Sequence, residues 1–206
     1  LMSLAKRSGG TVKVLYMCVG SCRQVVTGKT EENVRLEETK NAGKFGDFEY
    51  EIAYVGKEFL RLDTVPQREL VDKIEDMYVE FKPDVVVLPS HNSYNQDHRA
   101  TFTAGITALR PLPKKYRHSA QLVLECEEPY TWTTDDDSFK PNFYIPLTKK
   151  DLEAKKKLLA CHETQVRDDP FPRSFDNLER IARMRGIEVG EEFAEAYKLL
   201  RGFISD

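Results

Sequence analysis

Two nearly unbroken apolar runs constrain the fold of this chain more than any other feature. Val12 to Val19 (VKVLYMCV) and Asp84 to Leu88 (DVVVL) are rich in β-branched residues and do not alternate between polar and apolar positions. Such runs are typical of strands that are buried on both faces, as in a parallel sheet covered by helices. Each run is followed by a polar segment and then by residues that favour a helix, so the sequence predicts alternating strands and helices.

Helix signals separate the predicted strands. Leu70, Ile74, Met77 and Phe81 recur at helical spacing. The first half of the chain is predicted to form a strand at Val12 to Val19, a helix at Glu31 to Phe45 closed by Gly46 in the left-handed position past its end, and a strand at Glu49 to Val55. A helix from Pro66 that stops at Lys82-Pro83, a strand at Asp84 to Leu88 and a helix from about Asp97 to Leu109 follow. The last part is predicted to form strands at Gln121 to Cys126 and Phe143 to Leu147 around an acidic loop at Thr133 to Ser138, and helices from Thr148 onward.

The length of the chain favours one domain. Its 206 residues can bury a single core and contain no visible linker, so residues 1–206 are predicted to form one domain. Parallel neighbours need crossover connections, so the alternation predicts an α/β fold with a mostly parallel sheet and helices on both faces. Sheets of this kind bind ligands at the carboxyl ends of their strands.

Composition excludes several classes of protein. The 31 basic and 34 acidic residues are mixed along the chain, which leaves no basic face for nucleic acid. No apolar run approaches the ~20 residues of a membrane-spanning helix, and residues 1–10 do not resemble a signal peptide. Four cysteines without a disulfide framework favour a reducing compartment. We therefore expect a soluble, cytoplasmic protein, and the sequence leaves open whether it forms a homo-oligomer.

Ligand-capable side chains gather in the loop after the second apolar run. His98 can offer an imidazole nitrogen to a metal, and Asp97 can hydrogen-bond a neighbouring ring or a water molecule. The alternative is structural, because Asp97 could cap the following helix and leave His98 in its first turn. The residues alone do not separate these two interpretations.

Five segments, in order, resemble motifs of the LmbE/PIG-L family of zinc-dependent de-N-acetylases. The resemblance spans about residues 9 to 201. The segments are Arg35-x-Glu37-Glu38 with Ala42, Leu60 to Asp63, Asn95-Gln96-Asp97-His98-Arg99-Ala100 after Pro83-Asp84-Val85-Val86, Pro141-Asn142-Phe143 with Lys155 and His162-Glu163-Thr164-Gln165, and Gly186 with Glu192-Phe193-Ala194-Glu195-Ala196-Tyr197.

The resemblance implies a Rossmann-like, three-layer sandwich and a hydrolase that removes the acetyl group from an N-acetylglucosamine-like sugar or glycoconjugate. In this family, zinc is held by a His and an Asp from an N-terminal His-Pro-Asp-Asp motif and by a His from the second motif, which corresponds to His98. One zinc per chain is expected. A second Asp of the first motif acts as general base on the zinc-bound water. The resemblance also assigns catalytic roles to Asp97 and Asn95.

The chain departs from the family pattern in two ways. It contains no His-Pro-Asp-Asp, so either that motif and the first strand precede Leu1, or the chain is a metal-free relative that acts as a binding module. We expect the former, because a sheet without its opening strand would leave apolar edges bare. The second motif has Asn95 where the family usually has His. An amide donates hydrogen bonds but carries no positive charge, so His91 is a candidate to substitute for it.

Substrate contacts are predicted for Arg35 and Asp63 as well as His91. A guanidinium and a carboxylate suit sugar hydroxyls or a phosphate, although Arg35 could simply pair with Glu31 or Glu38 on its own helix. A phosphate-binding loop at Thr27-Gly28-Lys29-Thr30 fails because Arg23 stands where a glycine is required. A nicotinamide-binding fold lacks its Gly-x-Gly-x-x-Gly.

Overall fold

The computed structural model describes residues 1–24, 28–56, 59–128 and 138–204. The chain divides into two compact units. The first unit comprises Leu1–Phe59 and Tyr144–Glu195, and the second comprises Leu60–Phe143 and Ala196–Asp206. Within the described residues, no helix is both long and apolar enough to cross a membrane. The fold is a mixed α/β fold built from helices and small sheets.

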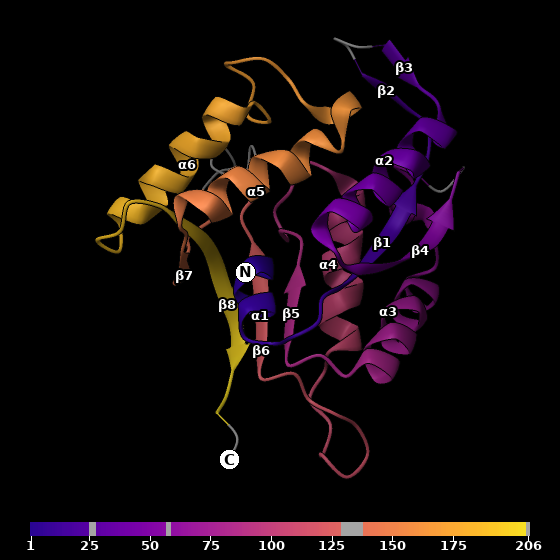
Figure 1. Cartoon of the computed structure of the whole chain (residues 1–206). Helices are drawn as coiled ribbons and strands as arrows, with labels where there is room; N and C mark the ends of the chain where they lie inside the picture. Colours follow the sequence, from indigo (N-terminus) through magenta and orange to yellow (C-terminus); the bar gives the residue numbers. More distant parts are fainter. Residues whose placement is uncertain (25–27, 57–58, 129–137, 205–206) are drawn as a thin grey trace. The chain divides into compact units, whose positions relative to one another are not determined.

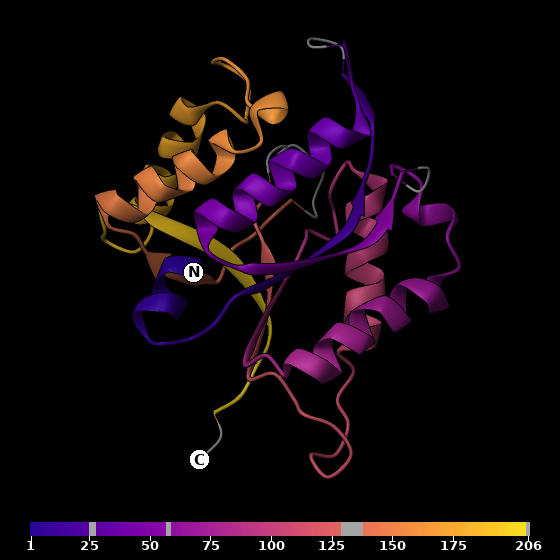
Figure 2. The ribbon, with the colours of Figure 1, turned by 45° about the vertical axis from the view of Figure 1, so that its right-hand side comes forward.

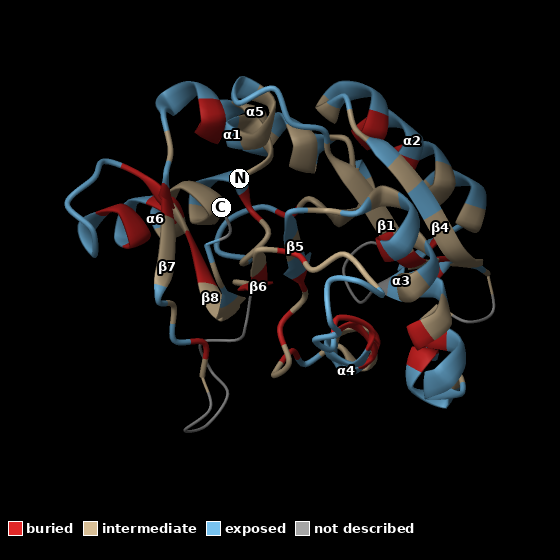
Figure 3. Ribbon diagram, turned by 90° about the horizontal axis from the view of Figure 1, so that it is seen from below, coloured by how far each residue is buried: buried red, intermediate tan, exposed pale blue. Residues whose placement is uncertain are grey.

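The second unit is organised around three neighbouring strands. β5 (Val85–Leu88) pairs in parallel with β6 (Leu122–Cys126), and this register sets Leu88 beside Glu125. β6 pairs in antiparallel fashion with β8 (Ala194–Gly202). Buried residues gather along β6 and β8 (Figure 3). The sheet order is β5-β6-β8-β7, where β7 is Phe143–Pro146. The end of β5 therefore lies beside the end of β6, and this contact positions the loop that follows β5.

Two helices of the second unit lie side by side, as Figure 1 shows for α3 (Gln67–Phe81) and α4 (Gln96–Ala108). A short 3-10 helix, η1 (Leu62–Thr64), contacts α4. The core of this unit joins helix and sheet residues: Tyr78, Leu88, Leu109, Ala120 and Val123.

A glycine allows α4 to approach β5 closely. A Cβ built on Gly105 would lie 2.6 Å from Cδ2 of Leu88, so a larger residue would require the Leu88 side chain or the helix to shift. The close approach places the second half of α4 against the last residue of β5.

The first unit contains the other parallel pair, β1 (Lys13–Val19) with β4 (Glu49–Val55). α2 (Glu32–Gly46) packs on this pair, as Figure 2 shows. A short antiparallel hairpin of β2 (Cys22–Gln24) and β3 (Gly28–Thr30) precedes α2. The residues considered for a phosphate-binding loop thus form a β-strand from Gly28 onward, and Thr27 lies outside the described residues.

The remaining elements of the first unit are helical. α1 (Met2–Arg7) opens the chain, and α5 (Lys149–Ala160), η3 (Glu163–Gln165) and α6 (Phe175–Ile187) follow β7. α5 contacts both α2 and α6. The core here includes Leu152, Ala182 and Phe193.

The predicted elements from Val12 to Leu147 are confirmed where the structure describes them, with shifts of a few residues at their ends. Two details of the prediction are wrong. Gly46 is the last residue of α2, and Asp47 takes the left-handed conformation, with φ of 48°. The segment after the last helix forms the strand β8 and not a further helix. The acidic loop at Thr133 to Ser138 lies outside the described residues, except for Ser138.

The predicted mostly parallel sheet is matched in part. β1 with β4 and β5 with β6 are parallel pairs, but they belong to separate small sheets, and β8 is antiparallel to β6. The antiparallel strand was missed because Ala194 to Gly202 (AEAYKLLRG) has no β-branched residue and contains strong helix formers.

Stability should depend on a capping box at the start of α5. The Thr148 side chain accepts a hydrogen bond from the Asp151 N–H, and the Asp151 carboxylate accepts one from the Thr148 N–H. Burial raises the pKa of Asp151, but hydrogen bonds from Thr148 and Arg7 outweigh it and lower the value to about 2. Because the folded state prefers the charged form, the stabilisation is present above about pH 4 and is lost toward pH 2.

We therefore predict that Asp151→Asn lowers the free energy of unfolding at pH 7 and that the difference from the native protein narrows at pH 3. Urea denaturation at both pH values measures it. The variant Asp72→Asn serves as control, since the Asp72 side chain is only half-buried and pairs with the exposed Arg68 within α3. An equal loss at both pH values would contradict the charge-based explanation.

Candidate functional site

The polar loop after β5 is held between a strand end and a helix start. Asn95 is the N-cap of α4, and its side chain accepts a hydrogen bond from the Asp97 N–H at 2.9 Å. The alternative in which Asp97 caps this helix is therefore not what the structure shows. The cap satisfies one of the unpaired N–H groups of the first turn and sets the direction in which Asp97 and His98 leave the helix.

His91 lies against Glu125, a carboxylate of β6 that is fully buried. The ring Nδ1 is 2.8 Å from Oε1 of Glu125. The same oxygen accepts hydrogen bonds from the Ser90 hydroxyl at 2.9 Å and from the His91 N–H at 3.3 Å. Oε2 of Glu125 has no hydrogen-bond partner among the described residues. The ring of His91 also packs against Phe102 of α4, with a centroid distance of 5.4 Å.

His98 lies against a second carboxylate, that of Glu128. Its Nδ1 is 2.6 Å from Oε2 of Glu128 and 3.0 Å from the Ser93 hydroxyl. Oε1 of Glu128 accepts a hydrogen bond from the Ser90 N–H at 2.7 Å. Glu128 is buried, whereas the His98 side chain is 44% exposed. Both contacts are on the Nδ1 side of the ring, so Nε2 is the nitrogen suited to a metal.

Asp97 is buried, and its carboxylate contacts the backbone at the start of η1. Its carboxylate accepts hydrogen bonds from the Leu60 N–H at 2.6 Å and the Leu62 N–H at 2.9 Å. Burial raises the pKa of Asp97 above its ordinary value, the two N–H groups oppose this, and the nearby Asp63 carboxylate raises it further. Asp97 therefore joins the start of α4 to the loop that contains Asp63, and Asp63 itself is exposed.

The structure thus brings together five of the predicted site residues, all in the second unit. His91, Asn95, Asp97 and His98 belong to the loop after β5 and the start of α4, and Asp63 lies on η1 next to Asp97.

Arg35 belongs to the first unit, where it is mostly buried on α2. Its Nη1 is 3.5 Å from both Glu38 Oε2 and Thr164 Oγ1, and its buried Nε has no partner among the described residues. Glu38 accepts hydrogen bonds from the Thr164 N–H and hydroxyl at 2.6 and 2.8 Å. Burial lowers the pKa of the neighbouring His162, and Arg35 lowers it further. The pairing with Glu38 that was considered as the structural alternative is present.

Glu125 and Glu128 were not predicted from the sequence, although a signal was available. Gln121 to Cys126 is otherwise a buried apolar strand, and a charged residue within such a strand is rarely buried without a specific partner. The sequence did not predict that this strand pairs with β5, and it is this pairing that brings Glu125 to the loop that contains His91.

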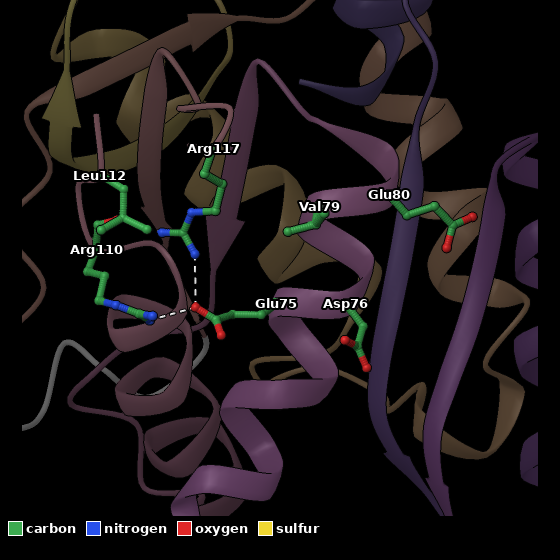
Figure 4. A pocket seen from close by; sticks show the side chains of 7 residues that line it. All are labelled: Glu75, Asp76, Val79, Glu80, Arg110, Leu112 and Arg117. Atoms are coloured by element: carbon green, nitrogen blue, oxygen red, sulfur yellow. Dashed lines mark hydrogen bonds and ion pairs between the residues drawn. The ribbon is translucent and has the colours of Figure 1, made fainter. Parts of the chain in front are cut away.

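A separate cavity of about 480 Å³ lies on α3 and the segment after α4 (Figure 4). Glu75 accepts hydrogen bonds there from Arg110 at 2.6 Å and Arg117 at 2.8 Å. None of the predicted site residues lines this cavity. Its lining residues are Glu75, Asp76, Val79, Glu80, Arg110, Leu112 and Arg117.

His98 has the chemistry of one ligand of a zinc site. A neutral imidazole whose Nδ1–H is held by a carboxylate is the usual form of a zinc-ligating histidine, and His98 fits this description. Across the described ranges, no cluster of three or more His, Cys, Asp or Glu side chains is arranged to hold a metal. His98 thus fits one ligand position.

Fold and site together define an α/β protein with a histidine- and carboxylate-rich cluster at the carboxyl end of a parallel strand pair. A family model described as PIG-L, GlcNAc-PI de-N-acetylase, matches residues 1–109, and the chain belongs to this family. A search of curated proteins found no significant match.

Solved structures share the fold at low sequence identity. The 4-carboxy-2-hydroxymuconate hydratase GalB of Pseudomonas putida KT2440 is 17% identical, with a TM-score of 0.75 over 100% of this chain and 90% of that one. The N,N'-diacetylchitobiose deacetylase of Pyrococcus horikoshii is 17% identical, with a TM-score of 0.72 over 98% and 77%. A zinc-inhibited form of the teicoplanin deacetylase Orf2 is 15% identical, with a TM-score of 0.69 over 99% and 92%.

We predict that Asp97→Ala lowers the free energy of unfolding by about 1–3 kcal/mol, because it leaves the buried N–H of Leu62 without its acceptor. Chemical denaturation measures the change. Asn95→Ala, which removes only the N-cap, is the matched comparison at about 1 kcal/mol. A smaller loss for Asp97→Ala than for Asn95→Ala would show that the attachment to η1 contributes little.

Proposed function

We propose that this chain belongs to a zinc-dependent hydrolase that removes an acetyl group from an N-acetylglucosamine-like sugar or glycoconjugate. The observation that supports this most is the geometry of His98, whose Nδ1 is held by the buried Glu128 so that Nε2 can bind a metal. Membership in the PIG-L family, whose model is described as a de-N-acetylase, supports the same reaction. The deacetylases among the structural neighbours are consistent with it.

In this proposal, His98 supplies one zinc ligand, and the remaining ligands come from the family's first motif. When bound, zinc would lower the pKa of a water molecule to about 7 and polarise the acetyl carbonyl. Asp97 maintains the position of His98 by attaching the start of α4 to η1. Asn95 would donate to the developing oxyanion through its amide NH2, because its Oδ1 already accepts the Asp97 N–H.

His91, Asp63 and Arg35 are the proposed substrate contacts. His91 is supported by a position in the same loop as His98 and by a side chain that is 27% exposed. Asp63 is exposed beside Asp97, where its carboxylate suits sugar hydroxyls. Arg35 is supported by the family resemblance and by a buried Nε without a partner among the described residues.

We also propose that residues 1–206 form a single domain with a Rossmann-like, mostly parallel sandwich, and that the protein is cytoplasmic. The two parallel strand pairs support the fold proposal. A small-molecule or glycoconjugate substrate is favoured over nucleic acid, since acidic and basic residues are nearly balanced.

We predict that the protein with its natural N-terminus binds about one zinc ion per chain and that His98→Ala sharply reduces the zinc content. Losing one protein ligand disables a three-ligand catalytic site. Elemental analysis of both proteins measures it, with acetate release from N-acetyl sugars as a parallel assay. His118→Ala is the matched control, because His118 binds the Pro83 carbonyl away from the loop. A folded native protein without zinc would favour the metal-free binding module instead.

We predict that Arg35→Gln reduces kcat/KM for an N-acetyl sugar by about 10- to 100-fold, mainly through KM, as a lost hydrogen bond to a charged group is worth about 1.5–3 kcal/mol. Steady-state kinetics test it, and a denaturation curve checks that the fold persists. The control is Arg68→Gln, since Arg68 is exposed and pairs with Asp72. Unchanged kinetics in a folded Arg35→Gln protein would leave Arg35 with the structural pairing alone.

A further inference from the structure

We propose that the two buried glutamates at the end of β6 are positioning residues, with Glu128 setting the tautomer of His98 and Glu125 setting that of His91. Each carboxylate accepts a hydrogen bond from the Nδ1–H of one ring. Nε2 of that ring then has no proton, and its lone pair is available to a ligand. The inference rests on the proposed function for what the rings bind, but the pairing itself depends on geometry alone.

In the contact between His98 and Glu128, only the ring can donate a hydrogen bond. An ionised carboxylate only accepts hydrogen bonds, so the proton on the 2.6 Å contact between His98 Nδ1 and Glu128 Oε2 belongs to the ring. The other oxygen of Glu128 accepts the Ser90 N–H at 2.7 Å. The carboxylate is thus held at both oxygens, and the ring it orients cannot rotate without losing a short, charge-assisted hydrogen bond.

Three hydrogen-bonding groups converge on one oxygen of Glu125. The Ser90 hydroxyl, the His91 N–H and the His91 Nδ1 all lie within 3.3 Å of Oε1 of Glu125. Ser90 Oγ also lies 3.4 Å from the Asn92 N–H, for which it is the acceptor, so its own proton is directed at Glu125. An oxygen on which donors converge acts as an acceptor, so Nδ1 of His91 carries the proton in this contact. His91 is then in the Nδ1–H form, as is His98.

Burial explains why these contacts are firm. Glu125 is fully buried and Glu128 nearly so, and removing a carboxylate from water costs free energy that hydrogen-bond donors offset. These donors meet both oxygens of Glu128 and Oε1 of Glu125. Ser90 serves both glutamates, through its N–H to Glu128 and its hydroxyl to Glu125. The two histidine–glutamate pairs are therefore one connected network, with its acceptors on and just after β6 and its donors on the loop after β5.

The tautomers can be measured without metal. We would label histidine with ¹⁵N in the chelator-treated protein with its natural N-terminus and record two-bond ¹H–¹⁵N correlations at a pH where both rings are neutral. We expect His91 and His98 in the Nδ1–H form. Glu128→Ala should shift His98 toward the Nε2–H form and leave His91 unchanged, whereas Glu125→Ala should do the reverse.

Ser93→Ala is the matched control. Ser93 also contacts Nδ1 of His98, but at 3.0 Å and without a charge, so its loss should leave the Nδ1–H form in place. If Glu128→Ala or Glu125→Ala does not fold, Gln replaces Ala, because Gln preserves the volume and weakens the acceptor. The proposal is overturned if native His98 is in the Nε2–H form, or if its ring shifts are unchanged in the folded Glu128 variant.

Cobalt titration separates this inference from the proposed function. If zinc-site chemistry is present, Glu128→Ala should weaken Co²⁺ binding by about 10- to 100-fold, as expected for a residue that orients a metal ligand, and Ser93→Ala should weaken it less. If the native protein binds no Co²⁺ but shows the expected tautomers, the proposed zinc enzyme is rejected and the positioning role is retained. If the native protein binds Co²⁺ but the His98 ring is unchanged in Glu128→Ala, the positioning role is rejected and the zinc site is retained.

Discussion

A carboxylate that is withdrawn from water needs hydrogen-bond donors, and in the second unit the Ser90 hydroxyl, the His91 N–H and the His91 ring all meet Oε1 of Glu125. Parallel pairing sets Glu125 beside Leu88, the last residue of β5. The chain that leaves β5 therefore supplies the donors, from Ser90 and His91. The shape of the loop follows from this demand, and so does the place at which α4 begins. The histidines occupy their positions because the buried acids behind them need partners.

Much of the fold could be predicted from local patterns. The apolar runs identified β1 and β5, and helical spacing identified α3, because both signals arise from burial of the element's own side chains. β8 could not be identified this way, since its strand conformation is imposed by pairing with β6 and its residues individually favour helix. The left-handed Asp47 was missed for a related reason, as Gly46 is the better residue for that conformation but the helix extends one residue further.

The sequence motif predicted where Asp97 and His98 lie but not which side chains they contact. Both residues lie, as predicted, at the start of the helix that follows a buried strand. Sequence adjacency suggested that Asp97 would serve the neighbouring ring, yet consecutive residues on a helix point in different directions, and Asp97 binds the amides of Leu60 and Leu62 instead. The acids that do contact the rings lie about thirty residues away along the chain. Such contacts depend on the register between two strands, and the local sequence of either strand does not specify that register.

The double attachment of Asp97 to Leu60 and Leu62 has a consequence for how relatives of this protein can diverge. The segment before α3 and the first turn of α4 share one buried anchor, so an insertion between Leu60 and Leu62 would displace both. Length variation that alters the surface around Asp63 must therefore occur on the far side of that anchor, toward Pro66 or before Leu60. The segment around Asp63 can therefore change in sequence, but its attachment to Asp97 keeps one point of its backbone in place beside the helix that contains His98.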